Sequence, residues 1–282
     1  MDAENATRIA AQTRLGEISL TVRELARSLA FYTESLGLDV LEAGDSQARL
    51  GSSGRGLVHL VEQRAAAVPR GRTGLYHLAL LEPSRAALAR SLRRLAASRT
   101  RLSGAADHGV SEALYLNDPD EIGIEIYRDR PREEWPRRGG ELAMVTEALD
   151  LESLLEEPEE GAAPGGTTLG HVHLHVAQLD AARTFYVDIL GFELRQRYGG
   201  QALFVAAGGY HHHIGLNTWQ GVGAPPPSDP STGLRHFEIV LPNAEAKARA
   251  RARLEQAGVA VRSDAGERLT LQDPSGNGIV LV

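Results

Sequence analysis

The sequence predicts an α+β fold made of four βαβββ modules, because long stretches recur and each repeated unit shows the same strand and helix patterns. LGEISLTVRELARSLAFYTESLGLDV at 15–40 returns as LGHVHLHVAQLDAARTFYVDILGFEL at 169–194, an offset of 154 residues (169 − 15). Two later stretches also return: GLYHLAL (74–80) as GLRHFEI (233–239), and NDPDEIGIEIY (117–127) as QDPSGNGIVLV (272–282). Self-similarity of this kind indicates repeated structural units. The chain therefore contains two copies of one domain, and each copy has two halves.

Each half begins with a short strand and continues into an amphipathic helix. Apolar and polar residues alternate in ISLTV, VHLHV, YHLAL and HFEIV, which is the pattern of a half-buried strand. A helical period follows, and Gly37 and Gly191 stand where a helix needs a left-handed residue at its C-terminal end. Further short strands complete each module. We predict two domains at 14–130 and 167–282, joined by a helical linker at 131–166.

Composition sets limits on the class of protein. A length of 282 residues is enough for two domains with their own cores. The net charge of −7 argues against nucleic-acid binding, and the absence of Cys excludes disulfides and thiolate metal sites. The N-terminal stretch lacks the apolar run of a signal peptide, and no stretch reaches the roughly 20 apolar residues of a membrane span. We therefore expect a soluble cytoplasmic protein with no membrane partner.

The stretch from Asp107 to Tyr127 carries the strongest functional signal. Two strand-like runs flank the turn-forming NDPDE, and Glu125 alternates with isoleucines in the second run. A carboxylate at such a position must be solvated, paired or bound to a metal, because burying it alone is costly. Tyr115 lies ten residues earlier (125 − 115), and His108 precedes the hairpin. These three side chains predict one half of an active site.

The repeated motifs resemble those of the vicinal oxygen chelate superfamily, which includes glyoxalase I, bleomycin- and fosfomycin-resistance proteins and extradiol dioxygenases. The resemblance covers both copies, and YRDRPREEW with GGYHHHIGLNTW is similar to the two-domain catechol-2,3-dioxygenase-like branch. It implies that modules pair into open barrels and that one barrel holds a single divalent metal. Two His and one carboxylate would bind the metal and leave positions for substrate and O₂. In this branch the metal would be Fe(II), with Mn(II), Zn(II) or Ni(II) as alternatives.

The two copies have lost complementary parts of this ligand pattern. Copy two has His171 and His236, but Val280 occupies the carboxylate position. Copy one has His77 and Glu125, with Glu17 at the position of His171. We hypothesise that the first half of copy two pairs with the second half of copy one. The exchanged barrel would then hold the metal through His77, Glu125 and His171.

Two simpler arrangements keep each copy intact. In the first, the metal lies in copy one on Glu17, His77 and Glu125, and His59 can join them. In the second, it lies in copy two with water in place of the missing carboxylate. Both stay open on the sequence alone.

The resemblance implies an extradiol ring-cleaving dioxygenase acting on a small aromatic diol with O₂. Strand alternation in HHHIGLN puts His213 on the face opposite His212, and we expect His213 to face the cavity. The resemblance then implies that His213 would be the base, Tyr115 would hydrogen-bond a substrate oxygen, and His108 would orient or shield it. One alternative is a metal-dependent isomerase or thiol transferase of the glyoxalase or fosfomycin-resistance type. Another is a metal-free ligand-sequestering protein. A homo-oligomer is compatible with each of these functions.

Overall fold

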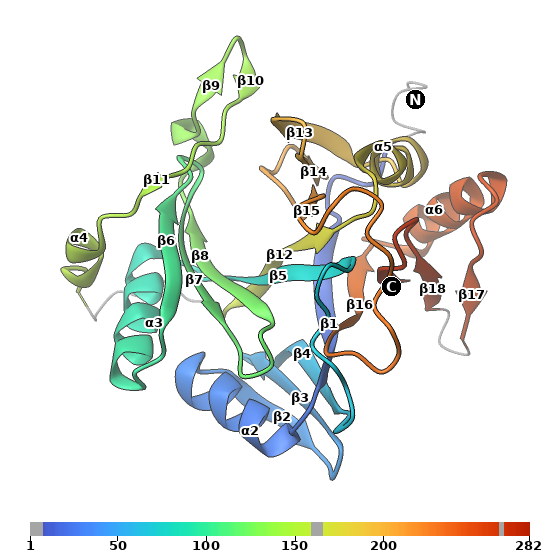
Figure 1. Cartoon of the computed structure of the whole chain (residues 1–282). Helices are drawn as coiled ribbons and strands as arrows, with labels where there is room; N and C mark the ends of the chain where they lie inside the picture. Colours follow the sequence, from blue (N-terminus) through green and yellow to red (C-terminus); the bar gives the residue numbers. More distant parts are fainter. Residues whose placement is uncertain (1–7, 159–165, 265–267) are drawn as a thin grey trace.

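The chain folds into two curled mixed sheets, seen side by side in Figure 1. The computed structural model describes residues 8–158, 166–264 and 268–282. One sheet has eight strands in the order β17-β18-β19-β16-β1-β4-β3-β2. The other has nine in the order β11-β6-β7-β8-β5-β12-β15-β14-β13. The α+β prediction is thus confirmed.

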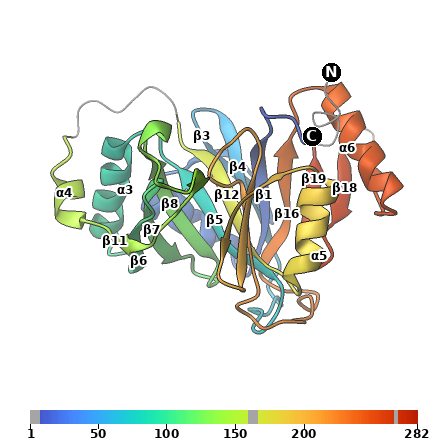
Figure 2. The same ribbon diagram turned by 90° about the horizontal axis from the view of Figure 1, so that it is seen from above.

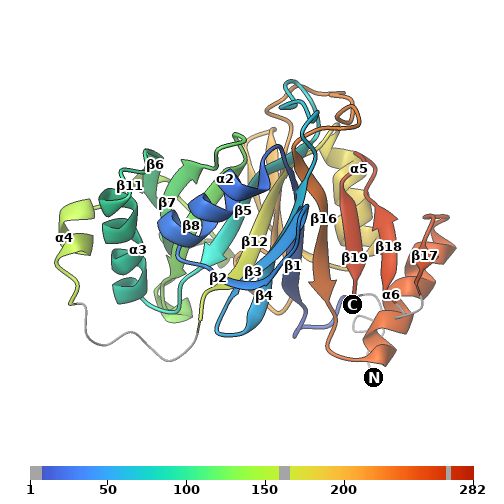
Figure 3. The ribbon, with the colours of Figure 1, turned by 90° about the horizontal axis from the view of Figure 1, so that it is seen from below.

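The eight-stranded sheet combines the first and last quarters of the chain. Its strands are β1 (Arg14–Val22), β2 (Asp39–Ala43), β3 (Gln47–Ser52), β4 (Arg55–Glu62), β16 (Gly233–Val240), β17 (Arg262–Ser263), β18 (Leu269–Gln272) and β19 (Gly278–Leu281). Its helices are α2 (Leu25–Ala30), η1 (Phe31–Ser35) and α6 (Ala244–Gln256). Figure 3 shows the blue β1 beside the orange β16.

The nine-stranded sheet combines the two middle quarters and one linker strand. Its strands are β5 (Gly74–Leu81), β6 (Leu102–Asp107), β7 (Ser111–Asn117), β8 (Gly123–Asp129), β11 (Glu147–Ala148), β12 (Thr168–His175), β13 (Glu193–Tyr198), β14 (Ala202–Ala206) and β15 (Ile214–Asn217). Its helices are α3 (Arg85–Ala97), α5 (Leu179–Arg183) and η3 (Thr184–Ile189). In Figure 2, α3 lies at one end of the molecule, and α5 and α6 lie at the other.

The sheet order confirms the exchange of modules between copies. β1 of the first copy pairs antiparallel with β16 of the second, with Arg14 opposite Val240. β5 of the first copy pairs antiparallel with β12 of the second, with Leu81 opposite Thr168. Each sheet therefore joins one module from each copy.

Buried Tyr–Asp contacts tie the two sheets together within each copy. Tyr32 of η1 donates to Asp118 at 3.3 Å, and its repeat equivalent Tyr186 of η3 donates to Asp273 at 3.0 Å. Both tyrosines are fully buried. Burial raises the pKa of Asp118 to about 6, although two backbone N–H groups and Tyr32 oppose the shift. The two halves of one copy thus contact each other from one sheet to the other, whereas the first strands of the modules pair with strands of the other copy.

Helix ends follow the sequence signals. Ser84 and Asn243 cap α3 and α6 by accepting the N–H of Ala87 and Ala246. Gly37 and Gly191, predicted as C-terminal cap residues, have φ of +74° and +87°. These positive values require the conformational freedom of glycine.

The prediction of a helical linker at 131–166 is wrong for most of its described part. Its elements are a 3₁₀ turn, η2 (Arg132–Glu134), a hairpin of β9 (Arg137–Arg138) and β10 (Glu141–Leu142), the strand β11 and one short helix, α4 (Leu151–Leu155). The backbone pairs with β6 and its neighbourhood: Ala148 lies opposite Ala106, and Val145 donates to the carbonyl of His108. These sheet bonds override the local helical pattern. Residues 159–165 of the predicted linker lie outside the described residues.

The helices within the described part of the chain are all too short or too polar to cross a membrane.

Candidate metal centre and active-site cavity

Three neighbouring strands bring two imidazoles and one carboxylate together. β5 lies between β8 and β12 in the nine-stranded sheet. His77 is on β5, Glu125 on β8 and His171 on β12. All three side chains are buried, with exposed fractions of 6%, 2% and 1%. The Oε2 atom of Glu125 lies 3.1 Å from the Nε2 of His77 and 3.1 Å from the Nε2 of His171. The two Nε2 atoms are 3.4 Å apart.

These separations fit three ligands on one face of a divalent metal. Protein ligands lie about 2.1 Å from such a metal, so two ligand atoms at right angles are about 3.0 Å apart and two at the tetrahedral angle about 3.4 Å. The observed separations of 3.1, 3.1 and 3.4 Å span these values. Among the described residues, this is the one group of three or more potential ligands found close enough to share an ion.

The protonation state of the group also suits a metal. Burial lowers the pKa of His171 to about 4, against the opposing effect of Glu125. The ring is therefore neutral at pH 7, and a neutral imidazole with its proton on Nδ1 can bind a cation through Nε2. Burial opposes ionisation of Glu125, but His171 and His77 hold the pKa of this carboxyl well below its usual value, so it is anionic. Together the three side chains make up a two-His-one-carboxylate set.

The residues that the two rival arrangements require in addition lie in the eight-stranded sheet. Glu17 on β1 pairs with Arg49, with 3.0 Å between the Oε2 and Nε atoms. His59, on β4, has its Nδ1 3.3 Å from the hydroxyl of Ser19. His236 and Val280 lie on β16 and β19 of that sheet. The exchange places Glu17 and His59 in a different sheet from His77 and Glu125, and His236 in a different sheet from His171. Neither rival set is among the groups of described residues close enough to share an ion.

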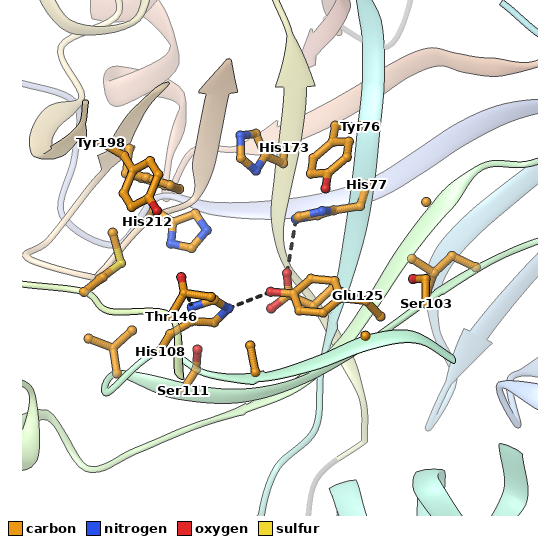
Figure 4. A pocket seen from close by; sticks show the side chains of 18 of the residues that line it. Tyr76, His77, Ser103, His108, Ser111, Glu125, Thr146, His173, Tyr198 and His212 are labelled. Carbon is orange, nitrogen blue, oxygen red and sulfur yellow. Dashed lines mark hydrogen bonds and ion pairs between the residues drawn. The ribbon is translucent and has the colours of Figure 1, made fainter. Parts of the chain in front are cut away.

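A second polar pair lies beside the triad. His108 Nδ1 is 2.8 Å from the carbonyl oxygen of Val145, and its Nε2 is 2.7 Å from the hydroxyl of Tyr115. A carbonyl can only accept, so Nδ1 carries a proton and Nε2 can accept from Tyr115. Burial raises the pKa of Tyr115 well above its usual value, and Glu125 adds to the rise, which keeps the phenol protonated. Both residues line the same cavity, and Figure 4 shows His108 near Glu125.

The predicted orientation of His213 is wrong, because its neighbour His212 lines the cavity in its place. The Nδ1 of His213 accepts the N–H of Ala207 at 3.1 Å. The sequence argument extended strand alternation back through the histidine run, but β15 begins only at Ile214. The preceding turn contains two glycines with positive φ, which breaks the alternation. Sequence reasoning therefore identified the histidine run that reaches the cavity, but not the histidine that lines it.

A carboxylate on β8 controls the orientation of His212. Asp129 Oδ1 lies 2.8 Å from His211 Nε2, and His211 Nδ1 lies 2.8 Å from His212 Nδ1. Because the carboxylate accepts, His211 Nε2 is the donor and its Nδ1 can accept from His212. His212 then keeps an unprotonated Nε2. Burial lowers the pKa of His212 well below its usual value, and His171 and His211 add to this shift.

These groups surround one cavity of about 560 Å³. His77, Glu125 and His212 lie along its wall, as Figure 4 shows, and Tyr115 lines it as well. The rest of the wall includes several side chains that the sequence did not single out: Tyr76, Met144, Val145, Thr146, Gln196, Tyr198, Phe204 and Trp219. They lie on strands, loops and the linker, where repeat analysis gives no orientation.

Acid should destabilise the metal-free protein. The pKa of His171 falls from 6.5 to about 4 on folding, so between these values the unfolded chain binds a proton that the folded chain does not. The contribution of the neutral ring to the free energy of unfolding is complete above pH 6.5 and is lost as the pH falls towards 4. At about pH 5 the loss is about 2 kcal/mol. Urea unfolding at about pH 7.5 and pH 5 measures this difference in the free energy of unfolding. An equal free energy of unfolding at both values would contradict the prediction.

Comparison with known proteins agrees with the fold. The profile of the Glyoxalase/Bleomycin resistance protein/Dioxygenase superfamily matches residues 14–126 and 168–281. A protein named catechol-2,3-dioxygenase from Bacillus subtilis (strain 168) is 45% identical over 263 residues, covering 90% of this chain and 92% of that protein. Glyoxalase I from Zea mays has a TM-score of 0.60 at 16% identity, covering 96% of this chain and 92% of its own. The cppA protein from Streptococcus pneumoniae TIGR4 has a TM-score of 0.53 at 14% identity, covering 95% and 97%. The chain therefore belongs to the Glyoxalase/Bleomycin resistance protein/Dioxygenase superfamily.

Proposed function

We propose that this protein is an extradiol ring-cleaving dioxygenase that acts on a catechol-type aromatic diol with O₂. The observation that carries the proposal is the convergence of the buried side chains of His77, Glu125 and His171, the first two of which line the cavity. The relative named catechol-2,3-dioxygenase, 45% identical over 90% of the chain, supports the same activity. We assign these three side chains as the ligands of Fe(II); Mn(II), Zn(II) and Ni(II) suit the same donors less specifically.

A divalent metal bound there would polarise the hydroxyls of the diol and offer open positions to substrate and O₂. The remaining steps belong to the protein. His212 presents an unprotonated Nε2 to the cavity and accepts a proton from the diol. Its Nδ1–H donates to His211, which donates to Asp129, and this chain of hydrogen bonds holds the ring in place.

Tyr115 and His108 act on the other side of the cavity. The hydroxyl of Tyr115 donates to His108, so a lone pair of its oxygen accepts a hydrogen bond from the substrate. The carbonyl of Val145 holds the proton of His108 on Nδ1. These contacts orient the ring of the diol, and the apolar wall limits access of water to the reacting atoms.

The isomerase alternative is disfavoured by the cavity wall. An isomerase of this fold would use a carboxylate as base, but Glu125 is the one carboxylate among the described side chains that line the cavity. Its oxygen already lies 3.1 Å from two imidazoles. The metal-free binding alternative leaves the convergence of three ligand atoms without a purpose.

An oxygen electrode tests the proposal. The protein is loaded with Fe(II) without O₂, and catechol and O₂ are then added. We expect O₂ and catechol to disappear in equal amounts while a yellow ring-opened product forms. The Zn(II)-loaded protein serves as the control, since it should bind catechol without consuming O₂. Failure of the iron-loaded protein to take up O₂, together with isomerisation of a hemithioacetal, would favour the isomerase.

A further inference from the structure

The mouth of the cavity is unusually apolar. Four of the seven large hydrophobic side chains exposed in the described part of the chain line this cavity: Tyr76, Val145, Tyr198 and Trp219, with exposed fractions of 41%, 38%, 54% and 44%. Large apolar groups gathered at one exposed place mark a site of binding. Tyr76 and Trp219 also touch edge to face, with ring centroids 5.1 Å apart. The mouth therefore favours an apolar ligand.

The described wall of the cavity supplies no arginine or lysine as a counterion for an anion. Its described side chains include neither Arg nor Lys. The arginines at the end of β8 are already engaged outside the cavity: Arg128 Nε lies 2.7 Å from Glu112, and Arg130 Nη2 lies 2.6 Å from Asp107. A negative substituent in the cavity would lose its hydration and gain no cation.

The outer wall is a strap of the linker, residues 144–146, held across the cavity by Gln196. The Oε1 of this side chain accepts the N–H of Met144 at 2.7 Å, and its Nε2 donates to the carbonyl of the same residue at 3.1 Å. Gln196 lies on β13, whereas Val145 bonds to the backbone of His108 at the opposite side. The side chains of Met144 and Val145 are thereby fixed as part of the wall.

The cavity is larger than an unsubstituted diol requires. Its volume of about 560 Å³ lies within the range of about 300–1,000 Å³ that holds drug-sized ligands. A single six-membered ring placed beside His77 and Glu125 leaves the space near the mouth unfilled. That space is bounded by Met144, Val145 and Tyr198. A substituent that fills it gains apolar contact.

We propose that the cavity selects neutral aromatic diols bearing an apolar substituent and rejects diols bearing an anionic one. The substituent lies between the 144–146 strap and the aromatic side chains of the mouth. The diol part of this assignment rests on the proposed function, whereas the preference for a neutral apolar group rests on the wall itself.

Three probes test the proposal: catechol, 4-isobutylcatechol and 3,4-dihydroxyphenylacetate, the last two having substituents of the same shape. kcat/KM is measured on iron-loaded protein, and Kd is measured calorimetrically on Zn(II)-loaded protein without O₂. We expect 4-isobutylcatechol to have a higher kcat/KM and a lower Kd than both other probes, by about tenfold relative to catechol and about 100-fold relative to 3,4-dihydroxyphenylacetate. Equal use of the two substituted diols would overturn the proposal.

The two measurements separate this proposal from the proposed function. If no diol is cleaved but the order of Kd values holds, the dioxygenase function fails and the preference stands. If catechol is cleaved but the acid binds as well as the isobutyl compound, the function stands and the preference fails.

Val145→Arg provides a gain-of-function test. The new guanidinium would stand at the mouth, and the backbone contacts of residue 145 with His108 would remain. We expect kcat/KM for 3,4-dihydroxyphenylacetate to rise at least about tenfold and that for 4-isobutylcatechol to fall. Val40→Arg is the matched control, since Val40 is 49% exposed on β2 of the other sheet. An equal rise in both variants would contradict the placement of the substituent.

Discussion

His77→Ala should remove the metal and lower kcat/KM for catechol at least about 1,000-fold, equivalent to about 4 kcal/mol of transition-state stabilisation. His77 Nε2 lies 3.1 Å from Glu125 and 3.4 Å from His171, so its loss breaks the three-ligand face. Metal content after anaerobic loading, measured by elemental analysis, gives the result independently of turnover.

The chain contains a matched control for this substitution. His236 occupies the position of His77 in the repeat, yet it lies on β16 of the eight-stranded sheet. His236→Ala should keep about one metal per chain and most of the activity. Glu17→Ala, at the repeat position of His171, should do the same. Loss of metal in either control, with retention in His77→Ala, would exclude the proposed ligand set.

His212→Asn should lower kcat about 100-fold while the metal stays bound, because asparagine has no counterpart of the Nε2 base. Its side-chain amide can still donate to His211 in place of Nδ1–H, so the surrounding hydrogen bonds persist. Steady-state kinetics and metal analysis on the same preparation separate loss of the base from loss of the site.

His213→Asn is the comparison that decides between the two histidines. The amide oxygen can replace Nδ1 as acceptor for the N–H of Ala207, so the fold should be kept. We expect kcat within about threefold of the unsubstituted protein. A large fall in kcat for His213→Asn, with little effect of His212→Asn, would restore the assignment made from the sequence.

The repeat was informative because it aligns equivalent positions of the two copies, so that a ligand position lost in one copy can be recognised. The complementary losses at Glu17 and Val280 predicted which modules pair. That pairing makes the strands of His77, Glu125 and His171 neighbours in one sheet. The same rule failed at His213, where a turn with two glycines replaces the strand. It also missed the linker, whose backbone pairs with β6 rather than following its helical pattern. Local periodicity carries no information about such long-range pairings.

The wall side chains were beyond prediction for a related reason. Met144 and Val145 reach the cavity only because Gln196, 52 residues away, holds the strap. Similarly, Trp219 follows the last strand of its module, and no repeat position defines where its ring lies. Their positions depend on contacts made after the sheets have formed.

The exchanged pairing has a consequence for how the chain folds during synthesis. All nine strands of the sheet with the candidate metal centre lie between residues 74 and 217. β1 can pair early with β4 on one side, but its other edge must wait for β16, since Arg14 pairs with Val240. Long-range pairing of this kind slows folding, and an unpaired strand edge is open to wrong partners. The sheet with the candidate metal centre can therefore assemble on the ribosome first, while one edge of β1, the first strand to emerge, is among the last to be paired.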